Sequence, residues 1–250
     1  MSVVAVYNLK GGVGKTATAV NLSAASAASF QRTLLWDLDP QGAATFYFRI
    51  RPRVRKGGRA MLQGKSGASR DIRATNYERL DVVPADFRYR RIDTLLGRLK
   101  RPKKRLSRLI NPQREDYDFQ WIDCAPTISL ISESVFEAAD VLLMPMVPTT
   151  LSLRTLEQVT EFMDRKGYRK PLLPFFTMVD QRKTLHREVM TELPKTFPGM
   201  LKTVIPYSSD VERMGTTRAP LRDFAPKSKA AKGYDALWVE LQQLLSSAPT

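Results

Sequence analysis

A glycine-rich turn near the N-terminus limits what this chain can fold into more than any other feature. Residues 10–16 read Lys-Gly-Gly-Val-Gly-Lys-Thr, between an apolar, β-branched run at 3–7 and an alanine-rich segment at 15–28. A strand, a glycine turn and a helix in this order direct successive backbone N–H groups and the positive end of the helix at one anion. Lys15 would then reach the β- and γ-phosphates of a nucleotide, and the Thr16 hydroxyl would bind Mg²⁺. The alternative, a glycine-rich hairpin with basic residues placed there by chance, is disfavoured by the Lys-Thr end and the flanking segments.

Short apolar runs alternate with helix-like stretches along the rest of the chain. Runs typical of strands lie at 33–36, 80–83, 119–122, 141–144, 172–176 and 204–205, and candidate helices lie at 132–138, 153–166, 185–195 and 234–245. This alternation predicts an α/β fold, a single doubly wound, mostly parallel sheet with helices on both faces. No repeat and no linker rich in Pro, Gly or Ser divides the chain. We therefore predict one domain over residues 1–250, with a basic loop or insertion around 49–69.

Two later segments accompany the glycine-rich turn, which itself departs from the usual phosphate loop by a second lysine, Lys10, at its start. Residues 34–42 read Leu-Leu-Trp-Asp-Leu-Asp-Pro-Gln-Gly, and residues 121–126 read Trp-Ile-Asp-Cys-Ala-Pro. In chain order, the three segments resemble the deviant Walker A box, the second box and the Walker B box of the ParA/MinD family of partition and positioning ATPases. Weaker likeness at 144–145, 177–180 and 205–206 extends the resemblance over most of the chain. The resemblance implies a P-loop ATPase that uses ATP and Mg²⁺.

The resemblance assigns roles in ATP hydrolysis to three carboxylates. Phosphoryl transfer to water needs neutralised charge on the γ-phosphate, a metal ion and a positioned nucleophile. By the resemblance, Asp39 would orient or activate the attacking water and Asp37 would assist near the metal. Asp123 would hold Mg²⁺ through water, beside a directly coordinating Thr16. Capping of the turn at Pro40 is the alternative role for Asp37 and Asp39, since Asp-Pro often starts a turn.

The same resemblance implies how the nucleotide is held. Lys10 would cross a dimer interface and contact the nucleotide of the other subunit, so that ATP is sandwiched between two chains and hydrolysis releases the dimer. The catalytic residues are then Lys10, Lys15 and Asp39. Met178 and Pro206 fall where the family packs adenine, although an apolar strand end has the same composition. The phosphates would be lined by Gly11, Gly12, Val13, Gly14, Lys15, Thr16 and Ala17.

Positive charge is concentrated in two segments. The chain has 250 residues and a formal net charge of +15, which points to a polyanionic partner. Residues 49–59 hold six basic residues and no acidic one, and residues 88–108 hold ten basic residues and one aspartate, so these two segments contain the whole excess. Lys and Arg without a base-reading module suit contacts to DNA phosphates, which give little sequence choice. The alternative is that these runs form solvated helix faces or pair with acidic residues elsewhere in the chain. The candidate DNA-binding residues in the second segment are Arg101, Lys103, Lys104 and Arg105. By the family resemblance, Arg182 is a fifth candidate, because it matches a position that contacts DNA.

Two other classes of protein with the same fold are alternatives to a partition ATPase. A MinD-like positioning ATPase would need a basic amphipathic helix to bind a membrane, but the apolar stripe at 234–245 has no Lys or Arg beside it. That helix is expected to pack on the sheet instead. A relative of the nitrogenase iron protein would need bridging cysteines, and the chain has one, Cys124. We expect a cytoplasmic, nucleoid-associated ATPase with self, non-specific DNA and a stimulating ParB-like or adaptor protein as partners.

Overall fold

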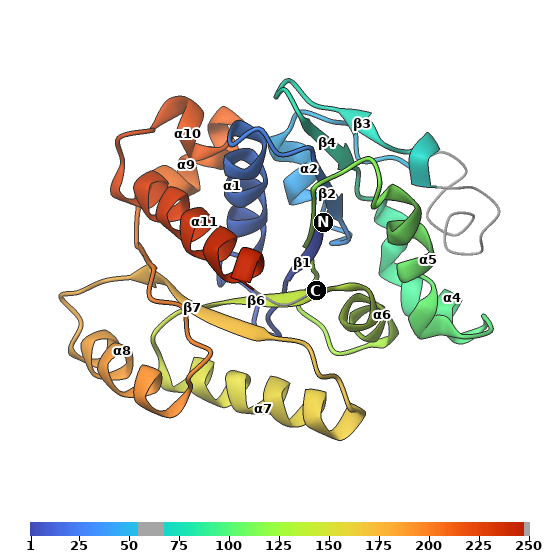
Figure 1. Cartoon of the computed structure of the whole chain (residues 1–250). Coiled ribbons are helices and arrows are strands. Elements are labelled where there is room, and N and C mark those ends of the chain that lie inside the picture. Colours follow the sequence, from blue (N-terminus) through green and yellow to red (C-terminus); the bar gives the residue numbers. More distant parts are fainter. Residues whose placement is uncertain (55–67, 248–250) are drawn as a thin grey trace.

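The central element of the fold is a mixed sheet in which parallel pairing dominates. The computed structural model describes residues 1–54 and 68–247. Their strands form an eight-stranded sheet in the order β3-β4-β2-β5-β1-β6-β7-β8 (Figure 1). Every neighbouring pair is parallel except β3 and β4, so the predicted doubly wound, mostly parallel sheet is confirmed. The strands are β1 Ser2–Val6, β2 Thr33–Asp37, β3 Arg73–Ala74, β4 Leu80–Val83, β5 Phe119–Asp123, β6 Val141–Met146, β7 Leu172–Val179 and β8 Val204–Pro206.

Helices cover both faces of the sheet. One apolar cluster joins the sheet to α4, α5, α6, α7 and α8, and the other joins it to α1, α2, α9, α10 and α11. Alternate residues of β1 divide between them, since Val3 and Ala5 belong to the first cluster and Val4 and Val6 to the second. A strand buried on both faces needs this continuous apolar sequence. The helices are α1 Lys15–Ala28, α2 Ala43–Tyr47, α4 Ile92–Gly97, α5 Ser107–Ile110, α6 Leu130–Ala138, α7 Thr150–Lys166, α8 Thr184–Thr196, α9 Ser209–Thr217, α10 Leu221–Phe224 and α11 Lys229–Ser247.

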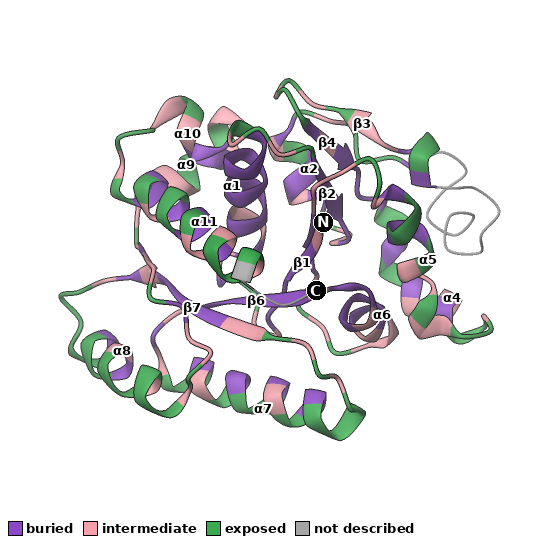
Figure 2. Cartoon of the chain, in the orientation of Figure 1, coloured by how far each residue is buried: buried purple, intermediate pink, exposed green. Residues whose placement is uncertain are grey.

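The C-terminal helix packs on the protein, as its stripe predicted. Tyr234, Leu237, Trp238 and Leu241 are buried, and α11 lies against α1 and β8 (Figure 2). The polar side of α11 faces outward. Within the described part of the chain, no helix is long and apolar enough to cross a membrane.

The two basic segments differ in how much of them the structure describes. Residues 55–67 of the predicted basic loop at 49–69 lie outside the described residues. The segment 88–108 folds into short helical pieces, with 3₁₀ turns at Phe87–Arg91 and Pro102–Lys104 around α4 and before α5. Its apolar side chains Ile92, Leu96 and Leu106 are buried, so the segment is anchored to the sheet and is no free arm.

Candidate nucleotide site

The turn between β1 and α1 has the backbone conformation of a phosphate loop. Gly12 and Gly14 have φ angles of +73° and +81°, which residues with a Cβ atom rarely adopt. Gly14 is the N-cap residue of α1, so the first N–H groups of this helix open onto the turn. A Cβ atom on Gly14 would lie 3.7 Å from both Thr177 Oγ1 and Met178 Cε, at the carboxyl end of β7. The predicted Met178 therefore lies against the loop. Thr177 lies beside it; the weaker family likeness at 177–180 included this residue but assigned it no role.

Lys15 is held inside the loop by its own backbone. Its Nζ donates a hydrogen bond of 2.8 Å to the Lys10 carbonyl oxygen, and only 7% of Lys15 is exposed. Burial lowers the pKa of Lys15, and the nearby Asp123 carboxylate acts in the opposite direction. The buried Asn8 fixes the start of the loop, because its side chain accepts from the Lys10 N–H and donates to the Pro145 carbonyl. The Lys10 side chain has no hydrogen bond or ion pair to any described residue.

Two buried carboxylates lie side by side next to the loop. Asp37 ends β2 and Asp123 ends β5, and the strand register places them opposite each other. Both are fully buried. Burial raises the pKa of Asp37 to about 6 against the effect of two hydrogen bonds from Thr45, one from its N–H and one from its hydroxyl. Burial and the neighbouring Asp37 raise the pKa of Asp123 well above its usual value, while the nearby Thr16 hydroxyl lowers it.

The donor atoms at this point suit a divalent cation. Both oxygens of Asp123 and Oδ1 of Asp37 are buried and have no hydrogen-bond partner among the described residues. A buried polar atom without a partner is costly, and a cation would remove that cost. Across residues 1–54 and 68–247, no group of three or more His, Cys, Asp or Glu side chains could hold a metal. Mg²⁺ is usually bound through one or two carboxylates together with water and substrate phosphates, and Asp37 and Asp123 are two carboxylates side by side.

Part of the turn-capping alternative is also present in the structure. Asp39 is half-buried, and its Oδ1 accepts a hydrogen bond of 2.9 Å from the Gln41 N–H. Asp37 uses Oδ2 for Thr45 near the start of α2. Each carboxyl group therefore supports the turn with one oxygen and keeps the other available. Thr45 was not predicted from the sequence, and its position shortly after the second box was the one signal that could have marked it.

The apolar candidates for adenine contact lie near one another. Met178 has a φ angle of +52°, and it precedes Val179, which is paired with Pro206 across β7 and β8. Pro206 lines a cavity of about 470 Å³ together with Val179, Tyr207 and Lys229. The carboxyl ends of β7 and β8 thus form a recess beside the phosphate loop.

The structure does not bring the candidate DNA-binding residues together. Arg182 follows the carboxyl end of β7, and its exposed side chain is paired with Asp180 at 2.8 Å. Lys104 lines a cavity with Asp140 and Lys170, which precede the amino ends of β6 and β7. These positions are at opposite edges of the sheet.

The remaining basic candidates near Lys104 differ in how free their side chains are. Lys103 forms an ion pair with Glu133 at 2.5 Å, and the Arg105 guanidinium donates to the Lys100 carbonyl. Arg101 is exposed. Lys103 therefore fits the alternative of pairing with an acidic residue, and Arg105 is held by a backbone carbonyl.

Replacing Asp123 with asparagine should stabilise the metal-free protein at pH 8, because burial and the neighbouring Asp37 raise the pKa of Asp123 and make its charged form costly in the folded protein. A carboxyl group whose pKa is raised on folding destabilises the fold once the pH exceeds its unfolded value, here 3.8. The gain from D123N should therefore be present at pH 8 and absent near pH 4. Urea unfolding in a chelating buffer at both pH values measures it.

The exposed Asp116 provides the matched control, because D116N removes a charge that is already in water. An equal gain from D123N at both pH values, or a loss at pH 8, would contradict the cost assigned to the buried carboxylate pair.

Comparison with known proteins places this geometry in a family. Residues 1–170 match the family model described as AAA domain. The chain is 32% identical to the sporulation initiation inhibitor protein Soj of Bacillus subtilis, over 93% of this chain and 94% of the relative. It is 30% identical to the chromosome partitioning protein ParA of Myxococcus xanthus, over 96% of this chain and 88% of the relative. The chain belongs to the ParA/MinD family of P-loop ATPases.

Solved structures share the fold over nearly the whole chain. Cobyrinic acid a,c-diamide synthase from Mycobacterium smegmatis, with bound ADP and magnesium, has a TM-score of 0.82 at 26% identity, over 99% of this chain and 96% of its own. A putative plasmid partition protein of Borrelia burgdorferi bound to AMPPNP has a TM-score of 0.84 at 18% identity, over 97% of this chain and 99% of its own. The likeness to this second protein concerns the fold alone. Members of this ParA/MinD-like fold thus include both partition proteins and a biosynthetic enzyme.

Proposed function

We propose that this ParA/MinD family member is a Mg²⁺-dependent ATPase that forms an ATP-sandwich dimer, binds DNA without sequence preference and positions a cellular cargo such as a plasmid or chromosome. The observation that carries the proposal is the buried group at the loop. Lys15 lies beside Asp123, and Asp123 lies beside Asp37 with oxygens that lack hydrogen-bond partners in the described part of the chain. The place of action would be the nucleoid in the cytoplasm, and a ParB-like or adaptor protein would stimulate turnover.

Each residue of the candidate site has a separate proposed role in ATP hydrolysis. The N–H groups of the loop and of the first turn of α1 bind the phosphates. Lys15 exchanges the Lys10 carbonyl oxygen for phosphate oxygens, and Thr16 and Asp123 would hold Mg²⁺, with Asp37 close by. The ion supplies charge neutralisation at the phosphates. Asp39 keeps one oxygen on Gln41 and directs the other toward the attacking water, to orient it and accept its proton.

Lys10 is expected to complete the site of a second subunit. The family resemblance supports this role, and the side chain has no partner among the described residues of its own subunit. We expect Lys10→Ala to abolish dimer formation with a non-hydrolysable ATP analogue, while the affinity of the monomer for the analogue changes less than about threefold, because Lys10 contributes little charge to its own subunit's site. Light scattering with and without the analogue measures the mass.

Lys202→Ala is the matched control, since Lys202 is exposed and far along the chain from the loop. Dimer formation that K10A leaves unchanged would overturn the sandwich arrangement.

Charge reversal at the two basic surfaces should weaken binding to random duplex DNA. We expect Arg182→Glu, and separately the triple change at Lys103, Lys104 and Arg105, each to weaken affinity by about tenfold and to reduce the salt slope by about one for each DNA phosphate that the variant no longer neutralises. The two surfaces are at opposite edges of the sheet, so their effects should add as free energies. Fluorescence anisotropy with ATP over a salt series measures both quantities.

Lys227→Glu supplies the same charge change as Arg182→Glu, at an exposed position outside both surfaces. Affinity that resists both salt and the charge reversals would contradict the DNA-binding role.

The C-terminal helix does not favour the membrane-bound alternative. The apolar side chains that a MinD-like helix would insert into lipid include Tyr234, Leu237 and Trp238, and all three are buried against the sheet. Flotation with anionic liposomes and ATP should leave the protein in the unbound fraction. Recovery with the liposomes would favour the MinD-like function instead.

A further inference from the structure

Parts of the two basic segments of the sequence meet in the folded chain. Residues 49–54 follow α2 and residues 86–91 follow β4, whose neighbour in the sheet is β2. The buried Asp86 accepts a hydrogen bond from the Val54 N–H, and the Arg88 guanidinium donates to the Val54 carbonyl. Asp86 also holds Arg88 in an ion pair at 2.7 Å. Basic residues that are far apart in the sequence therefore belong to one surface.

The other end of residues 49–54 is fastened to the end of α9. The Arg49 guanidinium donates a hydrogen bond of 2.7 Å to the Thr217 carbonyl. In the opposite direction, Arg218 Nε donates a hydrogen bond of 3.0 Å to the Phe46 carbonyl. Residues 49–54 thus connect the end of α9 to the turn after β4, over a distance that such a short segment limits to about 20 Å.

An exposed phenyl ring lies at each end of this connection, beside a guanidinium group. Phe87 is 61% exposed, and Arg90 Cζ lies 4.3 Å from the centre of its ring. Phe46 is 45% exposed, and Arg218 Cζ lies 4.2 Å from the centre of its ring. Part of each ring therefore stays open to a further stacking partner. We call this surface the arginine strip, and it consists of Phe46, Arg51, Arg53, Phe87, Arg90 and Arg218.

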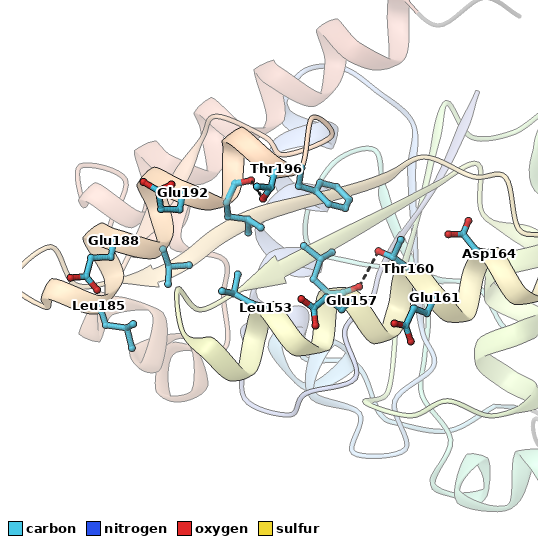
Figure 3. Close-up of a pocket in the computed structure, with 13 residues that line it drawn as sticks. Leu153, Glu157, Thr160, Glu161, Asp164, Leu185, Glu188, Glu192 and Thr196 are labelled. Carbon is cyan, nitrogen blue, oxygen red and sulfur yellow. Dashed lines mark hydrogen bonds between the residues drawn. The ribbon is translucent and has the colours of Figure 1, made fainter.

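The arginine strip is a strongly positive surface. Its four arginines form no ion pair with any residue in the described ranges, and the nearby Asp86 is buried and paired with Arg88. Carboxylates gather on a different surface, the groove between α7 and α8, which is lined by residues that include Glu157, Glu161 and Glu188 (Figure 3). The arginine strip therefore attracts a polyanion, and the groove between α7 and α8 repels one.

We propose that the arginine strip binds single-stranded nucleic acid, with phosphates on the arginines and unpaired bases stacked on Phe46 and Phe87. Proteins that bind single strands without sequence preference combine a positive surface with aromatic side chains on which the bases stack. Duplex DNA has the same phosphates, but its bases are already stacked on each other, so the two rings would contribute nothing to its binding. The inference goes beyond the proposed function, because it needs neither ATP nor duplex DNA.

Two other partners with negative charge fit the arginine strip less well. Helices that bind anionic lipid bury a continuous apolar face in the membrane. The rings of Phe46 and Phe87 lie at opposite ends of the strip instead, and Ile50 between them packs against the core. The carboxylates of a second copy of the chain would pair with the arginines but would provide no flat partner for the rings. A base and its phosphate match both parts of the surface.

The binding of short oligonucleotides to the full-length protein tests the proposal. The probes are fluorescein-labelled strands of thymidine DNA and of uridine RNA, each of about 12 nucleotides, and fluorescence anisotropy without ATP measures their affinity. We expect the double variant Phe46→Leu, Phe87→Leu to bind them at least about tenfold more weakly, because leucine keeps an apolar side chain and loses the ring face. Arg51→Gln with Arg53→Gln should reduce the salt slope by about 0.7 for each phosphate contact that is lost.

The chain provides a matched control for each change. Phe30→Leu is the control for the rings, because Phe30 is 77% exposed, lies near the Arg79 guanidinium and precedes the amino end of β2, away from the arginine strip. Arg154→Gln with Arg165→Gln is the control for charge, since both residues are exposed on α7. Both controls should bind the strands as tightly as the unchanged protein does.

The proposal is overturned if neither strand binds, if the leucine double variant binds them as well as the unchanged protein, or if Phe30→Leu weakens binding equally. Binding that depends on the two rings supports it with either strand, and the ratio of the two affinities identifies DNA or RNA as the source. Recovery with anionic liposomes, or a nucleotide-free dimer in sedimentation, that the double variant abolishes would overturn it in favour of lipid or of a second copy. ATP-dependent binding of duplex DNA is measured on the same proteins. Its absence from the unchanged protein would contradict the proposed function and leave the single-strand result standing.

Discussion

Replacing Lys15 with alanine is expected to weaken ATP binding by at least about a hundredfold and to reduce ATP turnover to background. Lys15 is the buried cation of the loop, with its Nζ poised 2.8 Å from the Lys10 carbonyl and Asp123 nearby. Without it the phosphates lose their fixed positive charge, and the carboxylates of Asp123 and Asp37 repel the incoming nucleotide. Calorimetric titration with an ATP analogue measures the affinity, and phosphate release measures turnover.

Folding must be separated from binding in this experiment, because Lys15 also offsets the charge of the buried Asp123. Lys15→Met loses the same charge but keeps the length of the aliphatic chain, so it should lose ATP binding equally without leaving the space that alanine would leave. Thermal unfolding of both variants shows whether each is folded. Lys227→Ala, at an exposed position, is the control for loss of a lysine. ATP affinity that survives K15M in a folded protein would contradict the assignment of the loop as the phosphate site.

Hydrophobic periodicity predicted the long elements of the fold well and the short ones poorly. Helix α1 was expected at 15–28 and is observed there, because an alanine-rich segment of fourteen residues with high helix propensity follows the glycine turn directly. Strand β7 extends three residues beyond its expected end at 176, since pairing with β8 continues past the apolar run. The two-residue strand β3, antiparallel at the edge of the sheet, has too few residues to show a period.

Motif order predicted which residues meet at the candidate nucleotide site, but not the burial and the hydrogen bonding of their side chains. Carboxylates at the ends of neighbouring parallel strands must meet at one edge of the sheet, so the proximity of Asp37 and Asp123 follows from the fold. Their burial, with three oxygens that have no hydrogen-bond partner in the described ranges, depends on side chains distant in the chain, which no local pattern describes. The separation of Arg182 from Lys104 has the same origin, because sequence order does not reveal which edge of a sheet a loop occupies.

Removing the charge of Asp39 is expected to reduce ATP turnover by about a hundredfold or more, while ATP affinity changes by less than about threefold. The half-buried carboxyl group has one oxygen on the Gln41 N–H and one available for water. Under the proposed function, a protein that binds ATP but cannot hydrolyse it should stay dimeric and bound to DNA. Phosphate release, analogue titration and dissociation from immobilised DNA measure the three properties.

Asparagine and alanine at this position separate catalysis from turn capping. Asp39→Asn preserves an oxygen that accepts from Gln41 and loses only the negative charge, whereas Asp39→Ala loses both. If the carboxylate acts on the water, both variants lose turnover alike, because neither can accept a proton there. If Asp39 only supports the turn before α2, D39N keeps the turnover of the unchanged protein and D39A alone loses it. The second pattern would remove Asp39 from the catalytic residues, and the first would leave its turn hydrogen bond as the means by which the carboxylate is held in place.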